Sequence, residues 1–336
     1  MTARLRFGLA IDFGTDAEPL SARVEWAAGL LEKAEGYGFE SVTAGEAYPT
    51  GGGYFHLPSP LLVLAALAGR TRMRIGTGVT LLPTWNVLRL AYDAAVLDEL
   101  SGGRLFIGAA AGSAEVWHRF GVDGHDLGRR LDESVQALKA LWRGEAGFDG
   151  EIVRVEGPIR PLPVQPGGPP IWLGGLVPRA ARRAAELADG WYAPSNQRLD
   201  SIKAQATRYH QALGENGGRG VVVVNRFAAV DESDAEAHRW GGPAIEATLQ
   251  KYAGLGGLRD DAGQTLGAGG PPLVPALDQQ LLLLGSPDTV NDRIERYAAA
   301  GVTHLQLRVA TGDVDPRLVE RSVTLLGEHV LPRWVG

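Results

Sequence analysis

The sequence predicts an α/β fold of the (β/α)8 class, a TIM barrel with insertion loops, as a single domain over residues 1–336. Short runs rich in β-branched and aromatic residues alternate with longer stretches of helical period, which is typical of βα units and a parallel sheet. Eight such units can be counted, and this number favours a closed barrel over an open doubly wound sheet. A length of 336 residues would suit two domains on the usual prior, yet barrels often use it as one.

The strands are expected at residues 5–11, 39–44, 73–80, 104–109, 170–173, 190–193, 220–230 and 302–309. Helical stretches follow them at residues 21–37, 58–69, 87–100, 128–142, 178–188, 199–213, 234–252 and 316–331, with another at 287–300 before the last strand. The functional site of such a barrel lies where the strands end, at the carboxyl side.

Two segments interrupt this rhythm. Residues 144–168 are predicted to form a hairpin insertion, and residues 254–275 form a stretch rich in glycine and proline. Long loops in a compact domain are often lids or disordered segments.

Composition narrows the class of partner. The net charge is −6 with both signs scattered along the chain, so the sequence predicts a small-molecule partner and no nucleic acid or membrane. The absence of cysteine excludes disulfides and thiolate metal sites and fits a reducing compartment, so we expect a cytoplasmic protein. The longest apolar run, residues 60–69, is about half of the roughly 20 residues that span a bilayer, and the N-terminal apolar run is too short for a signal peptide.

The segment "IWLGGLVPRAARRA" at residues 171–184 has the features of an anion site. Two glycines, Gly174 and Gly175, allow a ligand to approach the backbone, and Pro178 begins a helix whose first N–H groups are unpaired. With the helix dipole these groups favour a phosphate. The alternative is a tight strand-to-helix turn without a ligand. We expect Arg182 and Arg183 on the solvated face of this helix.

A second segment, "LDELSGGRLFIGAAAGS" at residues 97–113, places small residues at the end of the fourth strand. There they would meet a flat ligand at the barrel mouth, or simply allow tight packing. In "GRRLDE", Arg129 and Arg130 begin the next helix and could reach a phosphate from the side; exposure to solvent is the alternative.

These segments resemble a known family when taken in order. The stretches "LDELSGGRLFIGAAAG", "RRLDESVQALKALWRGE", "GPPIWLGGLVPRAARRAAELADGW" and "LLGSPDTVNDRIERYAAAGVTHLQLRV" resemble the bacterial luciferase-like monooxygenase superfamily of flavin- and coenzyme F420-dependent oxidoreductases. The likeness extends from Phe7 to Val309. It implies a barrel that holds coenzyme F420 or reduced FMN at its mouth, and a homo-oligomer.

The resemblance also assigns residues to the cofactor. Backbone contacts to its phosphate are implied for Gly174, Gly175, Leu176 and Val177, helped by Arg129 or Arg130. Gly112 and Ser113 are placed beside the cofactor, and a non-prolyl cis peptide at Gly78–Val79 would support the ring. Without the resemblance, "GTG" at residues 76–78 is a plain strand end.

One departure affects catalysis. Many members have an acidic residue followed by histidine after the second strand, whereas this chain has Glu46 followed by Ala47. Ser113 stands where some deazaflavin-dependent sugar dehydrogenases carry a glutamate, which argues against that activity. Glu46 is therefore the leading catalytic candidate, with His56 and Tyr48 from the same loop; a solvated, idle histidine is the alternative for His56.

Two further side chains, Asp12 after the first strand and Trp85 after the third, are expected to face the mouth. Aromatic residues near the mouth, Trp85, Tyr54, Phe55 and Trp117 among them, suit a largely apolar substrate.

The sequence thus predicts an F420-dependent oxidoreductase that transfers hydride to or from a small, largely apolar substrate. An Ala-, Gly- and Arg-rich, Lys-poor composition suggests a GC-rich genome and favours the deazaflavin. The alternatives are a reduced-FMN-dependent monooxygenase and a non-catalytic flavin-binding protein. A flavin or F420 reductase could supply the reduced cofactor.

The chain lacks the residues that two other classes of barrel enzyme, Schiff-base aldolases and metal-dependent hydrolases, require. A Schiff-base aldolase needs a strand lysine, but all four lysines lie in helical stretches. No metal site is expected, because there is no H-x-H pattern and His304 begins the last strand, at the end of the barrel that serves stability.

Overall fold

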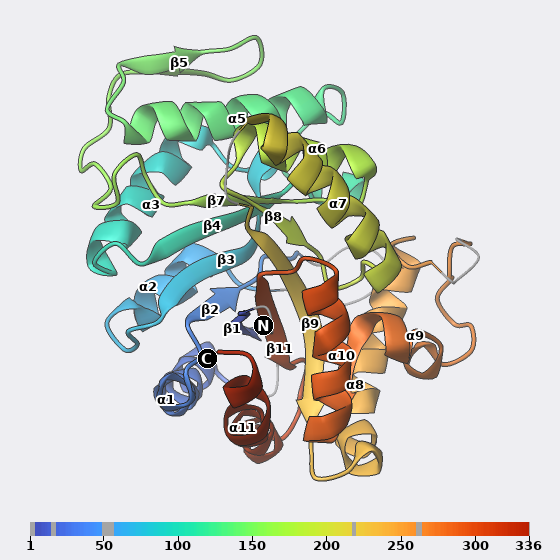
Figure 1. Cartoon of the computed structure of the whole chain (residues 1–336). Helices are drawn as coiled ribbons and strands as arrows, with labels where there is room; N and C mark the ends of the chain where they lie inside the picture. The colour runs from blue at the N-terminus through green and yellow to red at the C-terminus, as the bar shows by residue number, and fades with distance from the viewer. Residues whose placement is uncertain (1–3, 15–17, 49–56, 217–219, 260–263, 336) are drawn as a thin grey trace.

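The computed structural model describes residues 4–14, 18–48, 57–216, 220–259 and 264–335. Eight parallel strands close into a barrel (Figure 1), in the order β1, β2, β3, β4, β7, β8, β9 and β11. Pairing of β9 with both β8 and β11, and of β11 with β1, completes the ring. The predicted TIM barrel is confirmed. The strands are β1 (Arg6–Ile11), β2 (Ser41–Ala44), β3 (Arg74–Leu81), β4 (Leu105–Ala110), β7 (Ile171–Gly174), β8 (Gly190–Ala193), β9 (Val222–Val230) and β11 (His304–Ala310).

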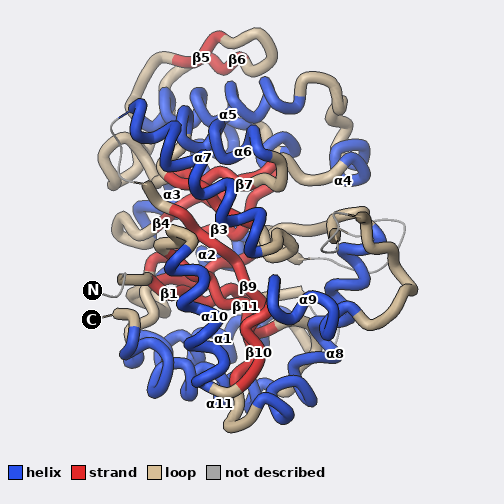
Figure 2. The backbone as a smooth tube through the Cα atoms, turned by 45° about the vertical axis from the view of Figure 1, so that its right-hand side comes forward, coloured by secondary structure: helices blue, strands red, loops and turns tan. Residues whose placement is uncertain are grey.

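Helices surround the strands on the outside, as the tube in Figure 2 shows. They form because apolar residues recur at helical spacing and bury one face of each helix against the barrel; in α6, for example, Ala181, Ala184 and Ala185 are buried. The main helices that follow the strands are α1 (Leu20–Tyr37), α2 (Pro60–Ala68), α3 (Val87–Leu100), α5 (Leu127–Trp142), α6 (Pro178–Leu187), α7 (Leu199–Asn216), α8 (Asp234–Gly254), α10 (Pro287–Ala299) and α11 (Pro316–Leu325).

Side chains from facing strands fill the barrel at its amino-terminal end. Phe106, Trp172 and Val223 form a buried cluster there, and Tyr192 joins this cluster from the side of the mouth pocket, which it also lines. In the layer formed by β1, β2 and β11, the Gln306 amide donates to Ser41 Oγ at 2.8 Å. A Cβ on Gly8 of β1 would lie 2.2 Å from that Ser41 oxygen, so only glycine fits between these two side chains.

The segment at residues 144–168 forms the expected hairpin. Its antiparallel strands are β5 (Gly147–Asp149) and β6 (Arg154–Glu156), which lie at the top in Figure 2. The Glu133 carboxylate of α5 accepts the backbone N–H groups of Glu151, Ile152 and Val153 at 2.8–3.1 Å. One buried carboxylate therefore anchors the tip of the hairpin to the barrel.

Four elements differ from the sequence prediction. Helix α8 extends to Gly254, and the following region contains α9 (Leu273–Leu281) and β10 (Leu282–Gly285), which pairs with β9 in parallel as a ninth strand. The prolines around residue 272 disguise the start of α9, since one of them forms its N-cap. The short helix α4 (Ala114–Arg119) was missed because six residues are too few for a helical period to emerge.

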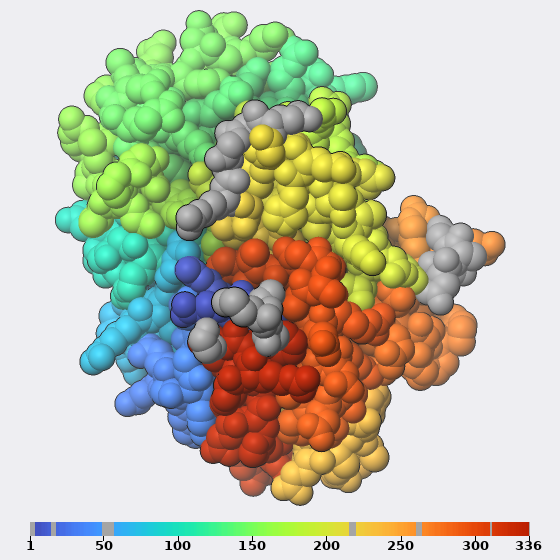
Figure 3. All heavy atoms as spheres, viewed as in Figure 1, coloured from blue at the N-terminus to red at the C-terminus, as the bar shows by residue number. Residues whose placement is uncertain are grey.

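The chain ends meet at the amino-terminal side of the barrel. A π-helical turn (Leu326–Val330) and a 3-10 turn (Leu331–Arg333) continue α11 where one helix was expected. The Leu5 N–H donates to the Trp334 carbonyl at 3.2 Å, and Figure 3 shows the blue and red ends side by side. Within the described ranges, none of the helices is both long and apolar enough to cross a bilayer.

Candidate functional site

A pocket of about 1000 Å³ opens at the carboxyl ends of the strands. All eight barrel strands, or the residues directly after them, contribute to its lining. The volume is at the upper end of the roughly 300–1,000 Å³ range of small-molecule sites. A pocket of this size in this position is the expected binding site of a barrel enzyme.

The wall formed by β3 projects into this pocket at Gly78 and Val79. The pairing of β3 with β4 is irregular between Thr77 and Thr80, and the peptide between Gly78 and Val79 is cis, as the family resemblance implies. A Cβ on Gly78 would lie 2.9 Å from both Thr43 Cβ and the Tyr192 hydroxyl. Glycine is therefore required at this position, and Val79 presents an apolar surface to the pocket.

The opposite wall carries the segment with the features of an anion site. Gly174, Gly175, Leu176 and Val177 line the pocket, and α6 begins directly after them. The N-cap residue makes no side-chain hydrogen bond, and the first turn of α6 contains no acidic residue. Uncapped N–H groups at a helix start bind anions well.

Close packing fixes this loop. A Cβ on Gly175 would lie 2.6 Å from Ala180 Cβ, so glycine lets the loop rest against the first turn of α6. The Gln205 side-chain amide of α7 donates to the Leu176 carbonyl at 2.7 Å, which anchors the loop from the other side.

Arg183 lies where the sequence did not place it. Its side chain is 14% exposed and donates from Nε to Asp132 of α5, and it lines the pocket beside the start of α6. The expectation of a solvated face is wrong for Arg183, because Asp132 turns its side chain inward. It is right for Arg182, which is 65% exposed and pairs with Glu186 at 3.3 Å.

Arg129 and Arg130, by contrast, do not line the pocket. Arg129 is half exposed and pairs with Glu151 of the hairpin. The predicted contact of either side chain with a phosphate finds no support in this placement. Arg183 stands closer to the anion site than both, since it shares the pocket lining with Gly175 and Val177.

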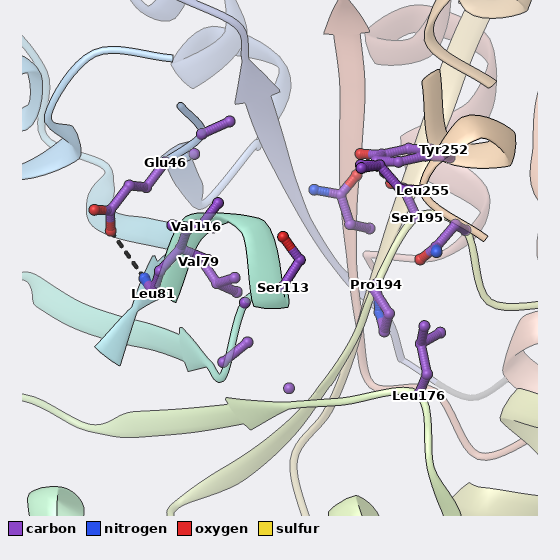
Figure 4. Close-up of a pocket in the computed structure, with 18 of the residues that line it drawn as sticks. Glu46, Val79, Leu81, Ser113, Val116, Leu176, Pro194, Ser195, Tyr252 and Leu255 are labelled. Carbon is purple, nitrogen blue, oxygen red and sulfur yellow. Dashed lines mark hydrogen bonds between the residues drawn. The ribbon is translucent and has the colours of Figure 1, made fainter. Parts of the chain in front are cut away.

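Glu46 is buried at the end of β2 and accepts three donors. The Leu81 N–H donates to Oε2 at 2.8 Å, the Trp85 indole reaches both oxygens at 3.0–3.1 Å, and the Tyr48 hydroxyl donates to Oε1 at 2.5 Å. Figure 4 shows the contact with Leu81. The carboxylate thereby fixes the chain that follows the Gly78–Val79 wall.

Burial, and then the adjacent Glu46 carboxylate, raise the pKa of the Tyr48 phenol well above its usual range. Tyr48 therefore stays protonated and donates to Glu46. Both residues line the pocket, as the sequence predicts. The third catalytic candidate, His56, lies outside the described residues, as do Tyr54 and Phe55.

The loop after β4 brings Gly112 and Ser113 to the pocket. Gly112 has a φ of 80°, in the left-handed region that favours glycine. The Trp117 indole donates to the Ala111 carbonyl at 2.6 Å, so the short helix α4 ties the loop down. Small residues here leave room for a ligand and also satisfy local packing.

A buried ion pair lies deeper in the pocket. Arg308 of β11 donates to both oxygens of Asp12, with contacts of 2.6–3.0 Å, and to the Tyr252 hydroxyl at 3.0 Å. Burial disfavours the charged guanidinium, but the charge of Asp12 outweighs it and raises the pKa of Arg308. Asp12 thus faces the mouth as predicted, and the pair keeps both charges there neutralised.

Sequence reasoning missed Arg308, Tyr252 and the loop at residues 194–196, all of which line the pocket. A signal for Arg308 existed, because the polar residues His304, Gln306 and Arg308 alternate along the last strand and so share its inward face. The loop is shaped by Arg226, a fully buried side chain that donates to the carbonyls of Pro194 and Gln197 at 3.2 and 2.6 Å. Figure 4 shows Pro194, Ser195, Tyr252 and Leu255 across the pocket from Glu46 and Leu81.

The fold and this site define a (β/α)8 protein with a large mouth pocket, which has an apolar wall at Val79 and an uncapped helix start at α6. The sequence model of the family described as "Luciferase-like monooxygenase" matches residues 5–304. The chain belongs to this family, and it is an oxidoreductase of the flavin- or F420-dependent kind.

Its relatives use both cofactors. A flavin-dependent trigonelline monooxygenase, oxygenase component, of Acinetobacter baylyi is 33% identical over 162 residues, 47% of this chain and 44% of that protein. An F420-dependent glucose-6-phosphate dehydrogenase of Nocardia farcinica is 27% identical over 317 residues, 88% of this chain and 91% of that protein. The crystal structure of monooxygenase RslO1 from Streptomyces bottropensis is 26% identical with a TM-score of 0.84, over 98% of this chain and all of that one.

Proposed function

We propose that this chain is an F420-dependent oxidoreductase that transfers hydride to or from a small, largely apolar organic substrate. The observation that carries the proposal is the union of two walls in one pocket of about 1000 Å³. The apolar surface at Val79 suits a flat ring system, and the open start of α6 with Arg183 suits a phosphate. A phosphorylated ring cofactor satisfies both walls at once.

The residues present fit such a cofactor. The backbone of Gly174, Gly175, Leu176 and Val177 and the Arg183 guanidinium would hold the phosphate, Gly78 and Val79 would support the ring, and Gly112 and Ser113 would lie beside it. A bound deazaflavin supplies a carbon that donates or accepts hydride, while the protein supplies position and surroundings.

The polar side chains near the Gly78–Val79 wall are proposed to position this wall and to take part in the reaction. Glu46 holds the backbone at Leu81 and the Trp85 indole, which keeps the ring wall in place. Tyr48 presents a protonated hydroxyl next to that carboxylate. We retain Glu46 and Tyr48 as the polar groups of the reaction, with His56 as a candidate on sequence grounds alone. Val116 and Leu255 line the remaining space and would exclude water from an apolar substrate.

The choice of F420 rests on two supports. An F420-dependent relative aligns over 88% of the chain, and the arginine-rich, lysine-poor composition fits a GC-rich genome. An F420 reductase would supply the reduced coenzyme where the reaction consumes it.

The second candidate is a reduced-FMN-dependent monooxygenase. It is favoured by the structural likeness to RslO1, with a TM-score of 0.84, and by the relative named as the oxygenase component of a flavin-dependent monooxygenase. Such an enzyme would depend on a separate flavin reductase. Its phosphate would occupy the same site at the start of α6.

A side-by-side titration with F420 and FMN tests the proposal. We expect micromolar or tighter binding of F420 and weaker binding of FMN, measured by the change in fluorescence of each cofactor. Tighter binding of FMN would transfer the function to the monooxygenase candidate. Binding of neither cofactor would remove both candidates.

Glu46→Gln tests the catalytic assignment. We expect turnover to fall by roughly 10²-fold, in the range of lost acid–base or positioning groups, with cofactor affinity nearly unchanged. Glu115→Gln is a matched control, because Glu115 also lines the pocket but is exposed. Equal turnover of the two variants would clear Glu46 of a role in the reaction.

A further inference from the structure

A second cavity, of about 650 Å³, lies between α5, α6 and α7 on the outside of the barrel. Its lining includes four arginines, Arg179, Arg182 and Arg183 of α6 and Arg208 of α7, and two carboxylates, Asp132 of α5 and Glu186 of α6. We call this cavity the arginine groove.

The spacing of these residues explains how the groove forms. Arg179, Arg182, Arg183 and Glu186 follow the i, i+3, i+4, i+7 pattern and therefore share one face of α6. The alanines at residues 181, 184 and 185 are buried against the barrel. Arg208 closes the groove from α7.

The arginine groove carries an excess of positive charge. Arg183 pairs with Asp132, and Arg182 pairs with Glu186. In the described part of the chain, no carboxylate lies within ion-pair distance of Arg179 or Arg208. With four guanidinium groups and two carboxylates in its lining, the groove favours a ligand with at least two negative charges.

The groove and the mouth pocket are neighbours, because Arg183 lines both cavities. Val177 and Ala180 line the mouth pocket, while Pro178 and Arg179 line the groove. The start of α6 thus separates the two spaces. A ligand with its phosphate at this helix end could extend past Arg183 directly into the groove.

We propose that the arginine groove binds a chain of carboxylates that extends from the cofactor beyond its phosphate. The glutamate tail of coenzyme F420 has this chemistry, whereas FMN ends at its phosphate. The inference rests on the proposed function and deepens it, because the groove would select the deazaflavin over the flavin. Arg179 and Arg208 provide the uncompensated charges that attract the tail.

Three probes test the assignment: F420 with its full glutamate tail, the same coenzyme trimmed enzymatically back to its phosphate group, and FMN. Affinities are measured by fluorescence titration for the wild-type protein and for the Arg179→Gln/Arg208→Gln double variant. Arg72→Gln is the matched control, since Arg72 is an exposed arginine two residues before β3, at the opposite end of the barrel.

We expect the tailed coenzyme to bind about 10-fold more tightly than the trimmed form at low salt, as a few exposed ion pairs would give. The double variant should lose most of this advantage while its affinity for the trimmed form stays unchanged. Added salt should reduce the advantage, because it screens exposed charges.

Equal affinity for tailed and trimmed coenzyme, or a double variant that behaves like Arg72→Gln, would overturn the groove assignment and leave the proposed cofactor intact. Tighter binding of FMN than of either deazaflavin would overturn both the groove assignment and the choice of F420. Binding of none of the three probes would overturn the proposed function and this inference together.

Discussion

The two ends of the barrel interior are built from the same strands but in opposite ways. At the amino-terminal end, the rings of Phe106 and Trp172 lie 4.2 Å apart, and His304 packs 5.5 Å from Trp172. Toward the carboxyl end, the strands present small residues such as Gly78, Ala110 and Gly174, and a space of about 1000 Å³ remains.

This difference indicates that the amino-terminal part of each strand contributes mainly to stability, whereas its carboxyl end contributes to the binding pocket. β7, for example, contributes Trp172 to the packed end and, two residues later, Gly174 to the pocket. A substitution should therefore affect folding or cofactor binding according to its height in the barrel. The following predictions test that separation, beginning with the largest expected effect.

Trp172→Ala should lower the free energy of unfolding by about 3–5 kcal/mol, the usual cost of removing a large buried aromatic side chain. Trp172 is 3% exposed, so a cavity would remain. Chemical denaturation measures the loss, and a cofactor titration of the folded variant should match the wild-type protein. A fall in affinity with little change in stability would break the comparison.

Asp12→Asn tests whether the buried ion pair between Asp12 and Arg308 stabilises the fold although it lies at the mouth of the barrel. It would leave the Arg308 guanidinium buried without its ion-pair partner and should cost about 3–5 kcal/mol of stability. The double variant Asp12→Asn/Arg308→Met removes both charges and should recover much of the loss in the same denaturation experiment. If the double variant were no more stable than the single one, the loss of stability would not come from a buried, unpaired Arg308.

Arg183→Gln should weaken cofactor binding by about 10-fold or more, because it removes a charge-assisted hydrogen bond to the phosphate. Its stability should change little, since the ion pair with Asp132 is partly exposed. Arg182→Gln on the same helix is the control and should bind a cofactor without a charged tail normally. Equal titration curves for the two variants would remove Arg183 from the phosphate site.

His304 gives the packed end a pH dependence. Burial, followed by the charges of Arg6 and Arg74, lowers the pKa of His304 to about 3. In the unfolded chain the His304 imidazole is protonated near pH 6.5, whereas in the folded chain it stays neutral down to about pH 3. The free energy of unfolding is therefore unaffected by His304 above pH 6.5 and decreases as pH falls from about 6.5 toward 3. Between pH 7 and pH 5, the wild-type protein should lose about 1–2 kcal/mol more than His304→Gln. Parallel unfolding curves at both pH values would contradict this.

Much of the fold was predictable because local patterns determine it. Short runs rich in β-branched and aromatic residues located the eight strands, and runs of period 3.6 located the helices that cover them. β10 escaped because its four leucine-rich residues follow α9 without a turn to separate them. Gly174 and Gly175 were predicted from the glycine pair before a helix start, whereas Gly78 and Gly112 were predicted only through the family resemblance.

The pairing of charged side chains could not be found in the same way. Arg183 lines the pocket because Asp132, 51 residues earlier, holds it there, and Arg308 is buried because Asp12, 296 residues away, neutralises it. Helical spacing placed Arg183 on the outside, where its neighbour Arg182 does lie. Long-range electrostatics therefore decided which of two adjacent arginines lines the pocket.

A crystal structure of the protein with bound F420 tests the central claim most directly. We expect phosphate oxygens within hydrogen-bond distance of the backbone at residues 175–177 and of the Arg183 guanidinium, with the ring against Val79. A phosphate bound elsewhere, with Arg183 in contact only with Asp132, would contradict it.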